Sequence, residues 1–422
     1  MNILVLFGGM ILLILLSMPI GYAIALSTIA AYGLYSSVPL TVVSQSAFTG
    51  LDSFVMLAIP FFILAGILMS MGGVAKRLID VADAVIGFVT GGLGMVAILT
   101  SAFFGAITGS GVATTSAVGA LMVPAMDDKK YGREFSSALV ASAGSIGVII
   151  PPSIPFVIYG VATGTSIGSL FLAGIVPGVL MTAALMMTCY VVSRKHGYKG
   201  SDTRPQLRKI GMTLKDGIWA LFAPVIILGG IYSGIFTPTE SAVVAVVYSL
   251  FVGMFIYKEL DRKKLYRAFY DAAVVNGITT FIVGFSSAMA KYLSLENVPQ
   301  TICDTILSIT HNKIILLLVL NIFLLIVGML IDIIPAIIIL SPIFLPLVMQ
   351  FGMTPLQFGV MITLNLAIGF VTPPYGCTLF VASAISKIPL ERMFKYAFLF
   401  SGVLVAVLLL ITYIPALTIW AL

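Results

Sequence analysis

Long apolar runs, interrupted by short polar segments, follow one another along the whole chain. Several runs approach or exceed about 18 residues, the length that is typical of a transmembrane helix. One of them, LLLVLNIFLLIVGML at Leu316–Leu330, is continuous. The strands of an outer-membrane barrel would instead alternate between apolar and polar residues. The pattern therefore predicts an all-α polytopic membrane protein.

Composition and charge support this class. Of 422 residues, 60% are hydrophobic and only 9% are charged, whereas an average soluble domain has about 25% charged residues. The net charge of +6 comes from Lys and Arg in short loops, so it sets orientation and indicates no nucleic-acid partner. Three separated cysteines provide no disulfide or metal framework. The N-terminal stretch has no basic region or cleavage site, so we expect it to be retained. Residues 1–35 fit either one tilted span or a broken pair.

The charged residues gather in five groups that set the topology. Loops rich in Lys and Arg lie on the cytoplasmic side, and alternating spans place all five groups on one face. Two apolar segments, residues 84–126 and 314–349, then begin and end on the same side. Each fits a pair of full spans or a re-entrant hairpin that turns inside the membrane. The five groups lie within residues 76–83, 127–134, 194–216, 258–267 and 387–395.

A repeat with an offset of 222 residues runs through the chain. The only two Pro-Pro pairs are separated by this offset, and the stretch SIGVIIPPS overlays AIGFVTPPY. Because residues 1–222 and 223–422 have opposite orientations under the charge argument, we expect an inverted-topology repeat, which is typical of secondary transporters. Isolated helix kinks are the simpler alternative, but a kink requires no twin at a fixed offset. The matched residues are Pro124 with Pro346, Gly147 with Gly369, Pro151 with Pro373, Pro152 with Pro374, and Ser110 with Asp332.

The two same-side segments have polar turns at equivalent places, TGSGVATTS (Thr108–Ser116) and LIDIIPA (Leu330–Ala336). Apolar runs flank both turns directly, so we expect re-entrant hairpins whose tips lie near the membrane midplane, buried in protein. Glycines expose backbone oxygens there, and hydroxyls add neutral oxygen ligands of the kind that hard cations prefer. Asp332 is the only acid inside a long apolar run of the second half. Its burial costs at least about 2.5 kcal/mol, so it contacts a cation, caps the following helix, or does both.

The Pro-Pro pairs predict two broken helices, at about residues 135–162 and 356–386. Proline removes a helical hydrogen bond and disfavours helix in the residue before it. Residues 147–153 and 369–375 should therefore be unwound, and each should face the hairpin tip of its own half. Half-helix C-termini offer partial negative charge to a cation, and half-helix N-termini offer partial positive charge to an anion. The sequence thus predicts two oxygen-rich pockets with an anion site between them.

The stretches FFGAITGSGVATTSAVGALMVPAM, ASAGSIGVIIPPSIPFVIYGVATGTSIGSLFLAGIVPG and AIGFVTPPYGCTLFVA carry a family resemblance. Over essentially its full length, the chain resembles the large membrane subunit (DctM type) of tripartite ATP-independent periplasmic (TRAP) transporters. The resemblance implies a sodium-coupled elevator transporter of an organic acid anion in the bacterial inner membrane. It also implies scaffold and transport domains interleaved across both halves, a small membrane partner of about four helices, and a soluble periplasmic substrate-binding protein.

The resemblance also assigns site residues. Substrates in the family include sialic acids and C4-dicarboxylates. Because no Arg or Lys lies in the tips or broken helices, a monocarboxylate such as sialic acid fits better than a dicarboxylate. The first sodium site falls on Thr108, Ser110, Gly111 and Gly147, the second on Asp332, Gly369 and Thr372, and the substrate site on Ser145, Ser153 and Tyr375.

Other functions fit the sequence less well. A membrane enzyme is disfavoured because no G-x-S-x-G, H-E-x-x-H or P-loop motif is present. A sodium-coupled carboxylate transporter that works without a binding protein is the nearest alternative. An ion channel is a further one, although channel filters normally repeat around a symmetric pore. We expect no metal site other than one for sodium.

Overall fold

The computed structural model describes residues 2–200 and 207–420, and within them the regular structure is entirely helical. In chain order the helices are α1 (Asn2–Leu15), α2 (Ile20–Tyr35), α3 (Thr41–Thr49), the 3₁₀ helix η1 (Phe54–Leu57), α4 (Ala58–Met71), α5 (Val74–Ile86), α6 (Gly92–Thr108), α7 (Gly111–Asp128), α8 (Arg133–Gly144), the 3₁₀ helix η2 (Ser145–Val148), α9 (Ile154–Thr163), α10 (Ile167–His196), α11 (Leu207–Tyr232), α12 (Pro238–Phe251), the π-helix η3 (Val252–Ile256), α13 (Arg262–Leu295), α14 (Val298–Ile309), α15 (Lys313–Leu330), α16 (Ile333–Gln350), α17 (Pro355–Gly369), α18 (Cys377–Ser386), α19 (Leu390–Tyr413) and α20 (Ala416–Ile419).

Many of these helices are suited to a membrane. In the described part of the chain, eight helical stretches are long and apolar enough to cross one, which confirms the all-α polytopic class. At the N-terminus the structure has the broken pair, because α1 and α2 are separated by a turn at residues 16–19. The eight stretches are Phe54–Met71, Ile167–His196, Ile210–Tyr232, Pro238–Ile256, Arg262–Leu295, Lys313–Leu330, Ile333–Gln350 and Leu390–Tyr413.

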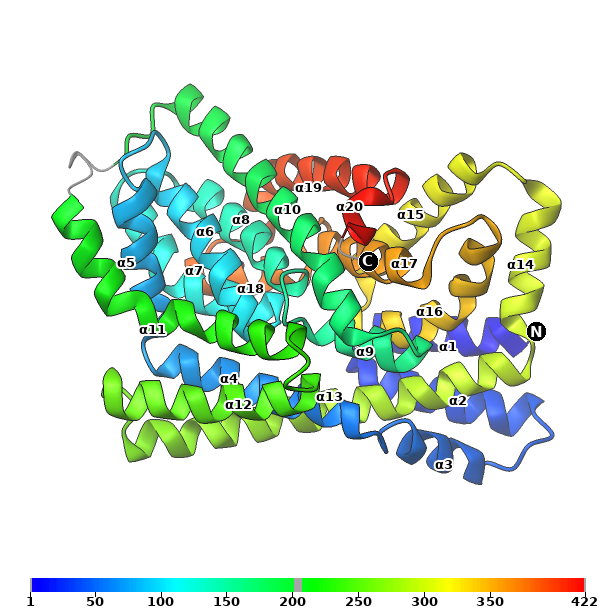
Figure 1. The fold of residues 1–422 in the computed structure, drawn as a ribbon. Helices are drawn as coiled ribbons and strands as arrows, with labels where there is room; N and C mark the ends of the chain where they lie inside the picture. Colours follow the sequence, from blue (N-terminus) through cyan, green and yellow to red (C-terminus); the bar gives the residue numbers. More distant parts are fainter. Residues whose placement is uncertain (1, 201–206, 421–422) are drawn as a thin grey trace.

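The helices form two groups. One group, called the helix wall, comprises α2, α3, α4, α12 and α13; α13 packs on α2, α3 and α4, and α4 packs on α12. The wall runs along the lower side of Figure 1. The other group, called the hairpin bundle, comprises α6 to α9 and α15 to α18. The two groups meet where α4 packs on α6 and where α13 packs on α16.

Two helix pairs with very short turns lie in the hairpin bundle. In the first pair, α6 and α7 are joined by Gly109 and Ser110; in the second, α15 and α16 are joined by Ile331 and Asp332. Gly109 ends α6 in the left-handed region, at φ 61°, which glycine tolerates best. The first pair begins at Gly92 and not near residue 84, because α5 is a separate helix that extends to Ile86.

Two helices are interrupted at the Pro-Pro pairs, where the sequence predicts the breaks. The first runs through α8 and η2, unwinds at residues 149–153, and resumes as α9. The second runs through α17, unwinds at residues 370–376, and resumes as α18. The segments α9 and α18 each have 10 residues, or about 15 Å at 1.5 Å per residue, which is half the thickness of a bilayer core. Each is therefore long enough for about half a span.

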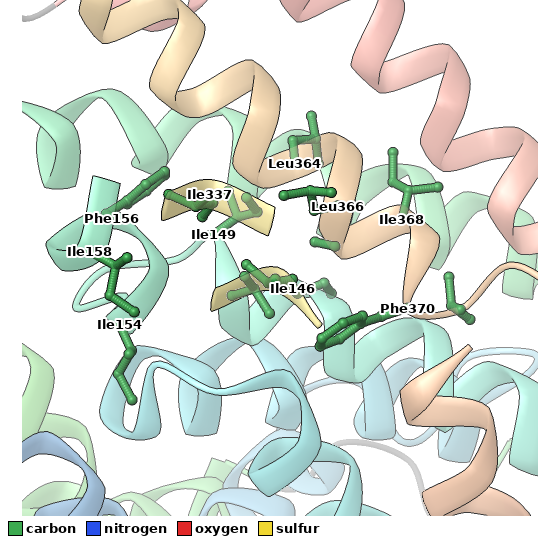
Figure 2. Close-up of a cluster of buried hydrophobic side chains, with 14 of the residues drawn as sticks. Ile146, Ile149, Ile154, Phe156, Ile158, Ile337, Leu364, Leu366, Ile368 and Phe370 are labelled. Carbon is green, nitrogen blue, oxygen red and sulfur yellow. The ribbon is translucent and has the colours of Figure 1, made fainter. Parts of the chain in front are cut away.

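Apolar side chains enclose the first break. Figure 2 shows Ile146 of η2 and Ile149 of the break among residues of α9, α16 and α17. These residues are almost completely buried, as is Ile337 of α16. Burial holds the unwound backbone of the first break away from lipid, which is the condition under which such backbone is tolerated in a membrane. The second break is partly open, because Pro374 and Tyr375 are exposed. The labelled members of this core are Ile146, Ile149, Ile154, Phe156, Ile158, Ile337, Leu364, Leu366, Ile368 and Phe370.

Candidate functional site

The turn of the first helix pair packs directly on the first break. The backbone oxygen of Gly109 accepts a hydrogen bond from the N–H of Ile154 at 3.4 Å. A Cβ atom added to Gly109 would lie 2.6 Å from the carbonyl oxygen of Pro152, and one added to Gly105 would collide with Cα of Gly147. The two backbones are therefore in contact, and only glycine allows this approach.

The second half repeats this arrangement. A Cβ atom on Gly369 would lie 2.6 Å from Cα of Gly328, so α15 and α17 also meet backbone to backbone. Asp332 lies within electrostatic range of Cys377, at the start of α18. Gly109 and Ile154, which touch in the first half, correspond to Ile331 and Gly376 at the offset of 222 residues. Ile331 and Gly376 directly precede Asp332 and Cys377 in the sequence. The first tip therefore contacts the break of its own half, and the second tip lies near the start of α18, which follows the second break.

Hydroxyl groups gather at the first tip. Oγ1 of Thr108 and Oγ1 of Thr114 are 3.1 Å apart, and both side chains are buried. The backbone N–H of Ser110 donates to Oγ1 of Thr108 at 3.4 Å. A Cβ atom on Gly147 would lie 2.6 Å from Oγ1 of Thr114. Thr114 therefore connects Thr108 and Ser110 with Gly147, whereas Gly111 packs on Val148 beside this cluster.

Thr114 was not among the residues assigned from the sequence. The pair Thr114-Thr115 lies within the predicted first tip and indicates further hydroxyl groups there. Sequence spacing alone does not show which of the two hydroxyls faces the break. Its neighbour Thr115 has a buried hydroxyl with no hydrogen-bond partner among the described residues, and it contacts Gly144. The first tip thus holds more oxygen atoms than the sequence assignment gave it.

The second tip carries the carboxylate. Asp332 begins α16, and its Oδ1 accepts a hydrogen bond from the N–H of Ile334 at 3.4 Å. Ser110 caps α7 in the same way, with Oγ accepting from the N–H of Ala113 at 3.4 Å. Thr372 donates its hydroxyl to the carbonyl oxygen of Ile368 at 2.7 Å. No hydrogen bond between described residues joins Asp332 to Thr372, and Gly369 packs on Gly328 of α15.

The predicted substrate residues lie in two different settings. Ser145 is fully buried and donates to the carbonyl oxygen of Ser142 at 2.7 Å. Ser153 is also fully buried, donates to Val148 O at 2.5 Å, and caps α9. Both serines therefore hold the backbone of the first break. Tyr375 is 58% exposed, with its ring 5.4 Å from that of Phe380, and it contacts neither serine through a described hydrogen bond.

Helix ends supply the electrostatics of this region. The helices α7, α9, α16 and α18 begin at the tips and breaks, and α6, η2, α15 and α17 end there. Helix N-termini carry partial positive charge and C-termini carry partial negative charge, each confined to about one turn. Across residues 92–126, 135–163, 314–349 and 355–386, Asp332 is the only side chain with a formal charge. The centre therefore presents partial charges of both signs from backbone groups, together with one carboxylate, which favours a cation.

Eight membrane-compatible helices around two broken helices, with an almost uncharged centre, define a polytopic membrane transporter. The sequence model of the family described as "Tripartite ATP-independent periplasmic transporter, DctM component" matches residues 7–417. The chain belongs to this family of large permease subunits; it is a component of a tripartite transporter in the bacterial inner membrane and not an enzyme.

Individual relatives agree with this assignment. The chain is 43% identical over 412 residues to the isethionate TRAP transporter permease protein DctMQ of Oleidesulfovibrio alaskensis, covering 98% of this chain and 65% of that protein. It is 36% identical over 385 residues to the sialic acid TRAP transporter large permease protein SiaM of Vibrio cholerae, covering 91% of this chain and 90% of that protein. The chain therefore spans about two thirds of the first relative and nearly all of the second.

A solved structure shares the fold. The crystal structure of the Alcanivorax borkumensis YdaH transporter matches with a TM-score of 0.58, covers 88% of each chain, and is 14% identical in sequence. At this identity the likeness shows the fold alone.

Proposed function

We propose that this subunit takes up an organic acid anion into the cytoplasm, driven by sodium and supplied by a periplasmic substrate-binding protein. The observation that carries the proposal is the pairing of each helix-pair turn with a broken helix, around a single carboxylate. Such a centre suits a cation and an anion that travel together. Family membership supports the tripartite organisation, with a small membrane subunit of about four helices as the second partner.

Two sodium sites follow from the oxygen atoms at the tips. The first uses Thr108, Thr114 and the backbone around Ser110, with Gly111 and Gly147 allowing close approach. The second uses Asp332 with backbone oxygens near Gly369 and Thr372, the residues that the family resemblance assigns to the same site. Sodium is cargo here, held by hydroxyl, carbonyl and carboxylate oxygens of the kind that hard cations prefer.

The anion site lies between the tips, at the N-termini of α9 and α18. Backbone N–H groups and hydroxyls at a helix start can hold one acidic group without a buried Arg or Lys. The two relatives described above are named for isethionate and for sialic acid, and each of these compounds has a single acidic group. We therefore propose a monoanion as substrate, with sialic acid as the first candidate and a C4-dicarboxylate as the alternative. Tyr375, exposed at the second break, is positioned to contact it.

Movement of the hairpin bundle against the helix wall would give alternating access. In this elevator scheme the wall is the scaffold, the tips are re-entrant, and the two halves are inverted repeats. The chain passes from α4 into α5 through Gly73, at φ 78°, and from α13 into α14 through Asn297, at φ 53°. These left-handed residues break the helix at equivalent places, so α5 and α14 can act as the two connecting arms.

Removing the Thr114 hydroxyl should weaken the first sodium site. Thr114→Val keeps the side-chain shape, so the fold should persist while one buried oxygen ligand is lost. A net loss of about 1 kcal/mol raises the sodium concentration for half-maximal uptake roughly fivefold. Thr188→Val on α10 is the matched control, because its hydroxyl only donates to the carbonyl oxygen of Ala184. If both variants need the same sodium concentration for half-maximal uptake, Thr114 is not a ligand of the first sodium site.

Reconstitution tests the function as a whole. Liposomes containing this subunit and its small partner are supplied with the binding protein, labelled sialic acid and an inward sodium gradient. Accumulation that requires both the gradient and the binding protein is the expected result. Uptake without the binding protein would favour the stand-alone carboxylate transporter, and sodium current without substrate would favour the channel. Competition by an unlabelled C4-dicarboxylate at equal concentration would move the substrate class to dicarboxylates.

A further inference from the structure

Buried amide groups join three helices about three helical turns before the second tip. Asn365 on α17 donates through Nδ2 to the backbone oxygen and the Oδ1 of Asn321 on α15, at 3.1 and 2.7 Å. Asn321 in turn donates to Oγ1 of Thr412 on α19 at 3.2 Å. Asn321 and Asn365 are only 2% and 0% exposed. We call this pair of asparagines the amide clamp.

Stability alone does not account for the amide clamp. The Oδ1 atom of Asn365 is buried and has no hydrogen-bond partner among the described residues. A buried network that is incompletely paired stabilises a fold less than apolar packing of the same volume. The equivalent positions of the first half, 222 residues earlier, are Leu99 and Ala143, and α6 packs on α8 there without amides. The same helix crossing can therefore be built from apolar residues.

The position of the clamp indicates its role. Asn365 precedes Gly369 by four residues, about one helical turn, and Asn321 precedes Gly328 by seven, about two turns. Gly328 and Gly369 are the residues at which α15 and α17 touch backbone to backbone. The amide clamp and the glycine contact thus fix α15 on α17 at two separate points. The end of α15 leads directly into Ile331 and Asp332, so both points restrain the second tip.

We propose that Asn321 and Asn365 are positioning residues, which hold Asp332 over the second break so that the second sodium site is already formed before sodium arrives. This inference rests on the sodium coupling proposed above. The asparagines act through α15 and do not touch the ion. Groups that orient the ligands of a metal ion typically change its affinity by about 10- to 100-fold when they are removed, so the clamp should affect sodium affinity more than stability.

The test replaces the clamp with the residues of the first half, as Asn321→Leu with Asn365→Ala. Sodium binding is measured on the purified permease complex without substrate, from sodium-dependent protection against thermal unfolding. We expect half-saturation at an approximately tenfold higher sodium concentration, with an unfolding temperature in sodium-free buffer close to that of the wild type. Asn365→Ser, which shortens the donor and changes the packing less, should shift sodium binding in the same direction.

Gln357→Leu is the matched control. Gln357 is 2% exposed and also makes two buried hydrogen bonds, to the carbonyl oxygens of Ile411 and Thr412 at 3.4 and 3.0 Å, but these join α17 to α19. It should lower the unfolding temperature and leave sodium half-saturation unchanged. Unchanged sodium binding in both clamp variants, or an equal shift in Gln357→Leu, would overturn the positioning role. A wild-type complex that shows no sodium binding would instead refute the proposed sodium coupling.

Discussion

Asp332→Asn should raise the sodium concentration needed for half-maximal uptake by roughly 30-fold, because it removes the only formal charge at the centre. A hydrogen bond or ligand contact to a charged group is worth about 2 kcal/mol, and 1.36 kcal/mol corresponds to a factor of 10. The fold should persist, since Asn caps a helix as well as Asp does and the N–H of Ile334 keeps its acceptor. Sodium titration of uptake in liposomes measures the shift.

Two further variants separate the effect of the Asp332 charge from the effect of its capping of α16. Asp332→Ala removes both, so it should lower the free energy of unfolding by about 1 kcal/mol more than Asp332→Asn does. Asp304→Asn removes an exposed carboxylate on α14 and should leave the sodium curve unchanged. If Asp332→Asn transports normally at limiting sodium, the carboxylate is a helix cap and nothing more.

Gly369→Ala should disrupt the second half of the centre more than any other single methyl group described here. The added Cβ would lie 2.6 and 2.7 Å from Cα and O of Gly328, which are backbone atoms that cannot rotate away. α15 must therefore move off α17, and overpacking of this kind costs about 1–3 kcal/mol. Because α15 ends at the second tip, we also expect sodium-driven uptake to fall. Thermal unfolding of the purified complex and liposome uptake measure the two effects.

Other glycines provide a graded comparison. In Gly328→Ala the nearest atom is Cα of Leu366, at 3.0 Å, so the loss should be smaller than in Gly369→Ala. Gly402→Ala on α19 places a Cβ where no atom lies within 4 Å, and in a helix this change should be neutral or stabilising by up to about 1 kcal/mol. If all three variants unfold alike, close backbone contact between α15 and α17 is not what the glycines provide.

The sequence was sufficient to predict the breaks and the tips, because proline and glycine act on the backbone locally. Pro151 and Pro373 mark the breaks, and the polar letters around Ser110 and Asp332 mark the tips. The start of the first helix pair was placed too early because residues 84–91 are as apolar as those that follow. A turn at residues 87–91, which ends in the left-handed Gly91 at φ 75°, separates α6 from α5.

Side-chain direction was less predictable. Thr114 faces the first break, whereas the Ser145 hydroxyl donates to the backbone of its own helix. Both residues lie in polar stretches, and the sequence does not distinguish these two orientations. The amide clamp was not predicted at all, since Asn321 and Asn365 are 44 residues apart and each looks like an isolated polar residue in an apolar run. Only the packing of α15 on α17 brings them together. Tertiary contacts between distant helices leave no local pattern in one sequence.

Thiol labelling of the two tips shows whether they lie inside the membrane. Ser110→Cys and Ile331→Cys are made separately in a complex whose native cysteines are replaced, and each is treated with a membrane-impermeant thiol reagent from either side. If both tips are re-entrant, we expect slow labelling of both positions, from the same side in a given state, and slower still with sodium present. Rapid labelling of the two cysteines from opposite sides, unaffected by sodium, would place the tips in ordinary surface loops and contradict the re-entrant arrangement.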